Sequence, residues 1–175
     1  MAKGYKLFRM VKGKLFPLYV FAGEETPQGV WIDARCGEKK DGKVKSRLGL
    51  LAYRPGWHIN DVCPYVTHIY SVHNGVKYQK DDTVWAEVEY SDEINYQAEA
   101  NECGRNEKGK IIPRNAYLKH VPENGFYRYK TNPSMYGAWI IAGSMRITRI
   151  LSDEEVEAMC HEHGLEPLKR YRKEK

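Results

Sequence analysis

Turn-forming residue pairs recur along the chain, and they limit the possible folds more than any other feature of the sequence. The pairs are Lys12-Gly13, Pro55-Gly56, Asn74-Gly75, Asn124-Gly125 and Asn132-Pro133, and pairs of this kind connect short strands. The 13 Tyr, 4 Trp and 15 Gly also suit a chain rich in β-sheet. We therefore predict an α+β fold with a mostly antiparallel, twisted sheet, forming a single domain over residues 1–168.

Several stretches have the residue patterns of strands. Residues 4–20 predict a hairpin, and residues 29–34 and 83–90 predict further strands, the last with one face toward solvent. Residues 139–151 predict one buried strand with a glycine bulge in its middle. Residues 36–47 are charged and contain glycine, which indicates a loop.

The clearest helix signal lies near the C-terminus. Ser152 and Glu155 have the spacing of a capping box, and Gly164 ends the helical pattern. We also expect one short helix within 91–103, capped by Ser91. The last segment, 169–175, holds five basic residues and one acidic residue, which predicts a flexible basic tail.

Charge is unevenly distributed along the chain, whose formal net charge is +5. Residues 1–23 hold five Lys or Arg and no acid, whereas residues 81–107 hold nine acids and one Arg. Separated charge of this kind concerns partners rather than the fold. The acidic segment could imitate a phosphate backbone, and the basic N-terminal region and tail could touch RNA or DNA.

The composition excludes several classes of protein. No apolar run approaches the roughly 20 residues of a membrane span, and basic residues interrupt any apolar core in the first residues, so we expect no signal peptide. We therefore expect a cytoplasmic protein with no membrane partner. The four Cys have no C-x-x-C spacing and are expected to be free thiols. We predict no metal site, although His58, Cys63 and His68 are evenly spaced. Neither common glycine-rich phosphate motif is present.

The stretch YRPGWH contains the densest group of chemically versatile side chains. A type II turn at Pro55-Gly56 would bring Arg54 and Trp57 together, and a guanidinium over an indole could stack a planar ring. His58 could move a proton near neutral pH. In the alternative interpretation, Trp57 fills the core and His58 bonds to backbone. Tyr53, Arg54, Trp57 and His58, with Arg9, are the candidate binding residues.

The sequence offers side chains for every catalytic role and therefore specifies none. The catalytic candidates are His58 and Glu87, the latter because Glu87 and Glu89 share a strand face about 7 Å apart and could act as acid and base. In the alternative interpretation both carboxylates are simply solvated. The chain is therefore more readily a binding protein than an enzyme.

The blocks YKLFRM, PLYV, ETPQGVWIDA, LAYRPGWH, VWAEVEY and WIIAGSMRITRIL together resemble a family of small, mostly uncharacterised proteins of bacteriophages, prophages and gut metagenomes. The resemblance covers nearly the whole chain, and RPGWH and VWAEVE are its most specific parts. It implies a phage-encoded accessory protein that binds a host macromolecule in the bacterial cytoplasm and needs no cofactor. Some proteins of this general kind inhibit CRISPR effector nucleases. An anti-CRISPR protein, with such a defence nuclease as its partner, is the specific form of the hypothesis.

The order of KLFR, YRPGWH and WIIAGSMRITRI is also similar to that of ADP-ribosyltransferase-like proteins. That similarity implies NAD as cofactor, an early Arg or His that binds it, and a late acid that activates the ribose. Arg9 matches the first position. Ala138 stands where the carboxylate is expected, which leaves Glu87 as a substitute. The alternative hypothesis is thus an NAD-using enzyme with its site around the RPGWH turn.

Overall fold

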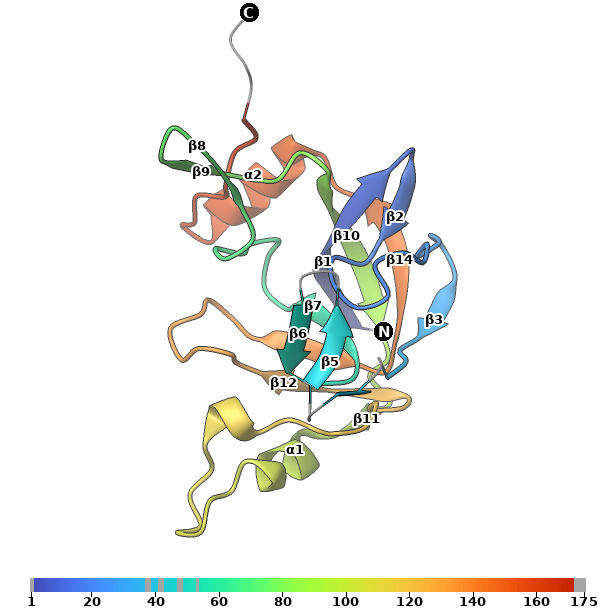
Figure 1. The fold of residues 1–175 in the computed structure, drawn as a ribbon, viewed down its shortest axis with the longest axis vertical. Helices are drawn as coiled ribbons and strands as arrows, with labels where there is room; N and C mark the ends of the chain where they lie inside the picture. The colour runs from blue at the N-terminus through green and yellow to red at the C-terminus, as the bar shows by residue number, and fades with distance from the viewer. Residues whose placement is uncertain (1, 37–38, 41–42, 47–48, 53, 172–175) are drawn as a thin grey trace, which may run out of the picture.

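A computed structural model describes residues 2–36, 39–40, 43–46, 49–52 and 54–171. The fold is α+β, with far more strand than helix (Figure 1). The strands of the main sheet are β1 (Ala2–Val11), β2 (Lys14–Phe16), β3 (Trp31–Asp33), β7 (Trp57–Asn60), β10 (Thr83–Tyr90), β11 (Ile94–Asn95), β12 (Gly125–Tyr129), β13 (Trp139–Ala142) and β14 (Ser144–Ile150). No helix in the described residues is long and apolar enough to cross a membrane.

The remaining elements are small. A second sheet contains β4 (Lys39–Lys40), β5 (Lys43–Ser46) and β6 (Gly49–Ala52), so part of the predicted 36–47 loop is strand. The hairpin of β8 (Ser71–His73) and β9 (Val76–Tyr78) turns at Asn74-Gly75 as expected. The helices are α1 (Gln97–Cys103), the 3-10 helix η1 (Pro113–Asn115) and α2 (Asp153–Glu162).

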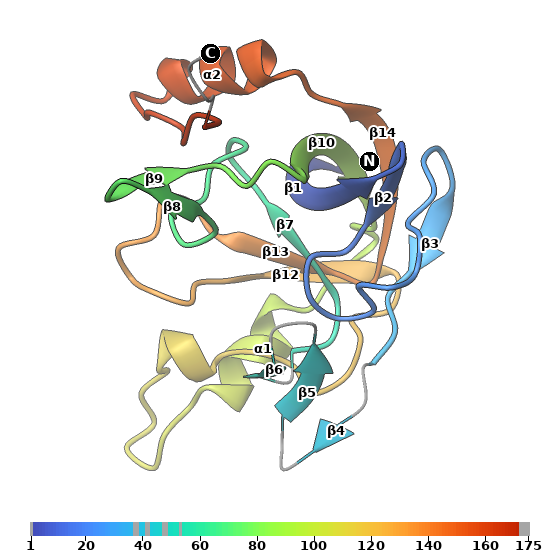
Figure 2. The ribbon, with the colours of Figure 1, turned by 45° about the horizontal axis from the view of Figure 1, so that its top comes forward.

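The main sheet has the strand order β11-β12-β13-β7-β1-β10-β14-β3, with β2 paired to β1. Its pairings are antiparallel except that of β11 with β12, so the sheet is mixed. It bends so strongly that β1, β10 and β14 face β7 and β13 across a shared core (Figure 2). The largest core cluster takes residues from both halves: Phe8, Leu15, Ile59, Ala86, Val88, Tyr90, Ile140, Ala142, Met145 and Ile147.

The predicted strand over 139–151 is in fact two strands, one in each half of the sheet. β13 pairs with β12 and β7, whereas β14 pairs with β10 and β3. The chain changes halves at Gly143, where a Cβ would lie 2.9 Å from the carbonyl carbon of Pro122 and 3.1 Å from Cα of Glu123. The glycine therefore permits close backbone approach at the bend rather than a bulge within one strand.

The two halves meet at a narrow seam between β1 and β7, where Tyr5 and Asn60 form the single paired position. A Cβ on Gly4 would lie 2.7 Å from the carbonyl oxygen of Asn60, so a larger residue would push the strands apart. Beyond this point the Lys6 ammonium donates to the carbonyl oxygen of His58 at 2.8 Å. A side chain thus replaces a backbone hydrogen bond where the strands diverge.

Helix α2 begins as predicted. The Ser152 hydroxyl accepts from the Glu155 amide at 3.1 Å, and the Glu155 carboxylate accepts from the Ser152 amide at 3.4 Å, which completes the capping box. The helix buries Val156 and Cys160 against Leu7 and Trp85 of the sheet. This packing covers one end of the molecule, and α1 lies at the other end (Figure 1 and Figure 2).

Helix α1 lies within the predicted 91–103 range but begins later than expected. Ser91 does not cap it, because its hydroxyl donates to the carbonyl oxygen of Gly125 at 3.0 Å and accepts from the Ser144 amide at 3.1 Å. The helix instead starts after Tyr96. Local spacing alone favours Ser91 as a cap, whereas its hydrogen-bond partners are distant in sequence.

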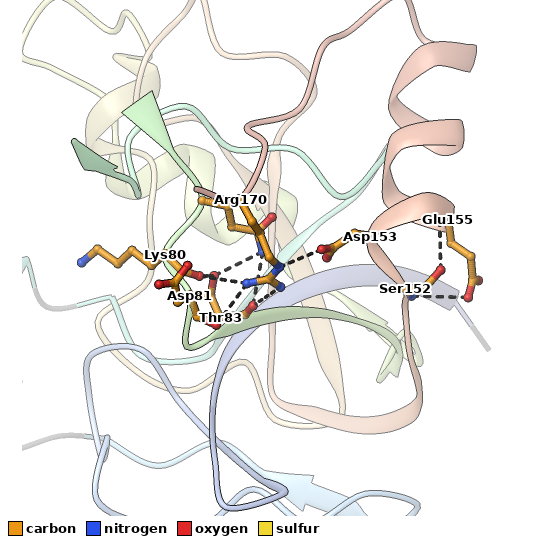
Figure 3. A network of polar contacts seen from close by, with 8 residues as sticks. Lys80, Asp81, Thr83, Ser152, Asp153, Glu155 and Arg170 are labelled. Carbon is orange, nitrogen blue, oxygen red and sulfur yellow. Dashed lines mark hydrogen bonds and ion pairs between the residues drawn. The ribbon is translucent and has the colours of Figure 1, made fainter. Parts of the chain in front are cut away.

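Residues 169–171, predicted to begin a flexible tail, lie against the body of the protein (Figure 3). The Arg170 guanidinium forms an ion pair with Asp153 at 2.8 Å and donates to the carbonyl oxygens of Lys80, Asp81 and Thr83. The Tyr171 ring stacks on His73 with centroids 3.9 Å apart. Arg170 is therefore occupied within the molecule rather than presented to a partner.

Candidate nucleic-acid interface

The predicted platform of Arg54 and Trp57 does not form. Trp57 packs against the core, and its indole N–H donates to the carbonyl oxygen of Ile32 at 2.9 Å. The cation near its ring is Lys6, whose nitrogen lies 5.8 Å from the centroid. Arg54 lies instead over Tyr129. The alternative interpretation of Trp57, as a core residue, matches these contacts.

His58 points away from Trp57, since consecutive residues of a strand face opposite sides of the sheet. Its Nδ1 lies 3.2 Å from the carbonyl oxygen of Gly56, and its ring packs edge-on to Trp139. Burial, reinforced by the positive charges of Lys6 and Arg54, lowers the pKa of His58 to about 3. The imidazole is neutral at physiological pH, which disfavours a role as proton donor.

Arg9 and Glu87 do not face a common space either. The registers Arg9↔Thr83 and Tyr5↔Glu87 place them four positions apart along β1 and β10, about 13 Å by strand geometry. Between them lie Leu7 and Trp85, buried beneath α2. A substrate bridging Arg9 and Glu87 would have to displace this packing.

Separate contacts hold the members of the predicted site. The Arg9 guanidinium donates to the carbonyl oxygen of Ala22 and lies over Phe16. Glu87 lies 3.7 Å from both Lys3 and Arg149. Tyr53 lies outside the described residues. The described candidate residues therefore form no common NAD-binding site, whether they come from the RPGWH stretch or are Arg9 and Glu87.

The carboxylates predicted to be an acid–base pair belong to a line of opposite charges on the outer face of the sheet. We call Lys3, Glu87, Glu89, Arg146 and Arg149 the charged ladder. Glu89 forms an ion pair with Arg146 at 2.7 Å, and the side chains of Glu87 and Glu89 are only 17% and 12% exposed. Their charges are compensated within the molecule.

This compensation weakens the hypothesis that segment 81–107 imitates a phosphate backbone. Besides the two ladder carboxylates, Glu99 contacts His120 at 2.8 Å and Glu102 contacts Arg105 at 2.6 Å. Four of the nine acids thus have basic neighbours. The acidic segment does not present a continuous row of uncompensated charge.

A shallow hollow between the main sheet and the C-terminal segment is mostly apolar. Its lining is Leu7, Pro64, Tyr65, Val66, Ile69, Gln79, Trp85, Pro167 and Leu168. None of the predicted site residues that the structure describes is in this lining. Within the part of the chain that the structure describes, no three His, Cys, Asp or Glu side chains gather as metal ligands.

A different group of residues combines positive charge with aromatic rings. We call Arg54, Arg114, Tyr117, Lys119 and Tyr129 the basic–aromatic cluster. The Arg54 guanidinium carbon lies 4.9 Å from the Tyr129 centroid and 5.6 Å from the Tyr117 centroid. The Lys119 nitrogen lies 3.8 Å from the Tyr117 centroid. Two cations therefore share one ring, an arrangement that lessens their repulsion through the negative face of the aromatic system.

The fold holds this cluster from three directions. Arg54 lies just before β7, Tyr129 ends β12, and Arg114, Tyr117 and Lys119 come from η1 and the loop after it. The Tyr129 hydroxyl donates to the carbonyl oxygen of Arg114 at 2.7 Å, and its ring packs edge-on to Tyr117 with centroids 5.7 Å apart. Burial is the main cause that raises the pKa of Tyr129. Tyr129 is thus held in a fixed position beneath the other residues of the cluster.

The electrostatics of the cluster are unlike those of the ladder. Residues 108–120 hold Lys108, Lys110, Arg114 and Lys119 and no Asp or Glu, and these four side chains belong to exposed residues. In the described ranges, no carboxylate forms an ion pair with Arg54, Arg114 or Lys119. The Arg54 Nε is buried and has no hydrogen-bond partner among those residues.

Sequence reasoning identified Arg54 but not the other members of the cluster. The available signal was the run from 108 to 120, which combines four bases and a tyrosine with no acid. That run is less conspicuous than the N-terminal region or the tail because glycine and proline interrupt it. Its proximity to Arg54 depends on the path of β12 and the loop, which the sequence does not reveal.

Comparison with known proteins adds no relative. No family model matches the chain, and neither a curated protein nor a solved structure matches it.

Proposed function

We propose that this protein is a phage-encoded accessory protein that acts by binding rather than by catalysis. Its ligand is nucleic acid, contacted through the basic–aromatic cluster. The observation that carries the proposal is that Lys119 and Arg114 are exposed and have no carboxylate ion-pair partner in the described residues, with Lys119 lying over Tyr117 and the Arg114 carbonyl oxygen held by the Tyr129 hydroxyl. Such cations are available to an external anion, and phosphate contacts by Lys and Arg supply most non-specific nucleic-acid affinity.

The phage setting comes from the resemblance of the sequence blocks and gives the proposal its biological form. A small phage protein that binds the nucleic acid of a host defence nuclease could hinder guide or target loading. A CRISPR effector nuclease is the partner we propose. An NAD-using enzyme receives no comparable support, because Arg9, Glu87 and His58 have separate environments.

The first test measures binding of the full chain to fluorescein-labelled single-stranded and double-stranded oligonucleotides by anisotropy, at about 50 to 200 mM KCl. We expect affinity to fall as salt rises. The Arg114→Ala/Lys119→Ala variant should weaken binding and reduce the slope of log K against log salt by about 1.4 for a single strand. Lys12→Ala/Lys14→Ala is the matched control, since it removes the same charge from exposed positions in the β1–β2 hairpin.

Absence of binding at low salt would overturn the nucleic-acid function. Equal loss of affinity in the cluster variant and its control would overturn the cluster as the binding site. The nuclease partner is tested separately by adding the protein to a CRISPR cleavage reaction. Inhibition that requires Arg114 and Lys119 supports it, whereas unchanged cleavage by several effectors removes that form of the proposal.

A further inference from the structure

We infer that the basic–aromatic cluster binds single-stranded nucleic acid by stacking an unpaired base on Tyr117. The inference rests on the proposed function and narrows its ligand to one class. Its starting point is that Tyr117 is half-buried and forms part of a supported surface. Tyrosine rings at such positions can stack on any base, because every base has a π-face.

The support beneath Tyr117 is rigid. Tyr129 is buried, packs edge-on to Tyr117 and is fixed by its hydrogen bond to the Arg114 carbonyl oxygen. Leu118, between Tyr117 and Lys119, is buried, and its amide donates to the Tyr127 hydroxyl at 3.2 Å. The ring therefore occupies a defined position before a ligand arrives, which lowers the ordering cost of binding.

The Lys119 side chain covers the Tyr117 ring and is free to move away from it. Its residue is exposed, and its ammonium lies 3.8 Å from the ring centroid. A lysine side chain has four rotatable carbon–carbon bonds and can swing away, whereas Arg54 has a buried Nε. When a base stacks on Tyr117, it displaces the Lys119 ammonium from the ring. The nucleotide also brings a phosphate, with which the displaced ammonium can form an ion pair.

A duplex cannot make this exchange without opening. Its base faces are stacked on one another, and the chain around the cluster offers no long helix to enter a groove. Segment 104–124 contains the three-residue η1 as its helix. An unpaired nucleotide presents base and phosphate together, which matches a ring that has the exposed Lys119 and the half-buried Arg54 beside it.

The test compares three labelled ligands at one salt concentration: an oligothymidylate of about 15 nucleotides, an abasic strand of equal length, and the corresponding duplex. We expect the oligothymidylate to bind about tenfold more tightly than the abasic strand, which keeps the phosphates but has no bases. It should also bind more tightly than the duplex. Equal affinity for all three ligands would overturn the stacking inference while leaving the proposed function intact.

Variants locate the stacking ring. Tyr117→Leu keeps an apolar side chain and should abolish the preference for the oligothymidylate over the abasic strand, whereas Tyr117→Phe should retain it. Tyr136→Ala, at an exposed tyrosine that contacts His163, is the control and should bind as the unmodified protein does. Thermal unfolding verifies that each variant is folded. Preference retained in folded Tyr117→Leu would contradict the assignment, and no binding of any ligand would instead refute the proposed function.

Discussion

The charged ladder and the basic–aromatic cluster contain similar numbers of cations but provide them with different neighbours. In the ladder, Arg146 lies 2.7 Å from Glu89, and Arg149 contacts both Glu87 and Glu155. In the cluster, Arg54 and Lys119 lie over Tyr117. The ladder balances its charge internally, whereas the cluster leaves positive charge for an external anion.

The same contrast extends to histidine. His120 contacts Glu99, and hydrogen bonding to that carboxylate is the main cause that raises its pKa. His58 has Lys6 and Arg54 as charged neighbours, and burial together with these cations lowers its pKa to about 3. Charge separated along the sequence therefore becomes two electrostatic environments in the fold, and the function of a basic residue depends on which of them it occupies.

The largest predicted effect is a loss of folding stability at acid pH that is due to His58. The unfolded chain binds a proton at this residue below pH 6.5, whereas the folded chain binds it only near pH 3. The free energy of unfolding should therefore fall as pH drops through this window, by a few kcal/mol at most.

Urea unfolding at several pH values tests this in the unmodified protein and His58→Gln. The variant should lose less stability between neutral pH and the acid end of the window. The carboxylates of the chain titrate in both proteins, so the difference between the two stability curves isolates the contribution of His58. Parallel curves would show that the imidazole is not held neutral by its surroundings.

The second prediction concerns the loss of an ion pair in the charged ladder. Glu89→Ala removes the partner of Arg146 at a buried position, and hydrogen bonds to charged groups typically contribute about 1.5–3 kcal/mol. We expect a loss of about 2 kcal/mol in the free energy of unfolding, measured in urea. Glu24→Ala is the control because Glu24 and Arg35 are both 57% exposed, and it should change stability by less than about 0.5 kcal/mol. Equal losses would mean that burial does not distinguish the ladder pair.

The sequence predicted those parts of the fold that depend on local patterns. The alternation in 83–90 yields β10, but the face predicted to meet solvent is covered, because Trp85 and Glu89 are buried and Glu87 is half-buried. The capping box at Ser152 yields the start of α2. Both signals lie within a few residues of the structure that they specify. The late start of α1 shows the limit, because Ser91 is engaged by Gly125 and Ser144 rather than by the helix.

The site was predicted less well, because it depends on contacts between distant segments. Trp57 and His58 are neighbours in sequence, but the strand sends them to opposite faces. Arg54 was identified, yet its aromatic partners are Tyr117 and Tyr129 rather than Trp57. Spacing along the chain cannot show which of several aromatic residues a turn will meet after the sheet bends at Gly143.

The smallest predicted effect on stability comes from a substitution that introduces a carboxylate into the basic–aromatic cluster, as in the charged ladder. Lys119→Glu places a carboxylate over the ring that Arg54 also contacts, and no described carboxylate forms an ion pair with Arg54. Exposed ion pairs contribute little, so the free energy of unfolding should stay within about 0.5 kcal/mol of the unmodified protein or rise slightly. Binding of the oligothymidylate should fall much more than in Lys119→Ala, because the new carboxylate both repels phosphate and occupies the remaining cations. Urea unfolding and anisotropy on the same samples separate these effects. If Lys119→Glu binds as well as Lys119→Ala, the uncompensated charge of the cluster is not what attracts the ligand, and the contrast with the ladder has no functional meaning.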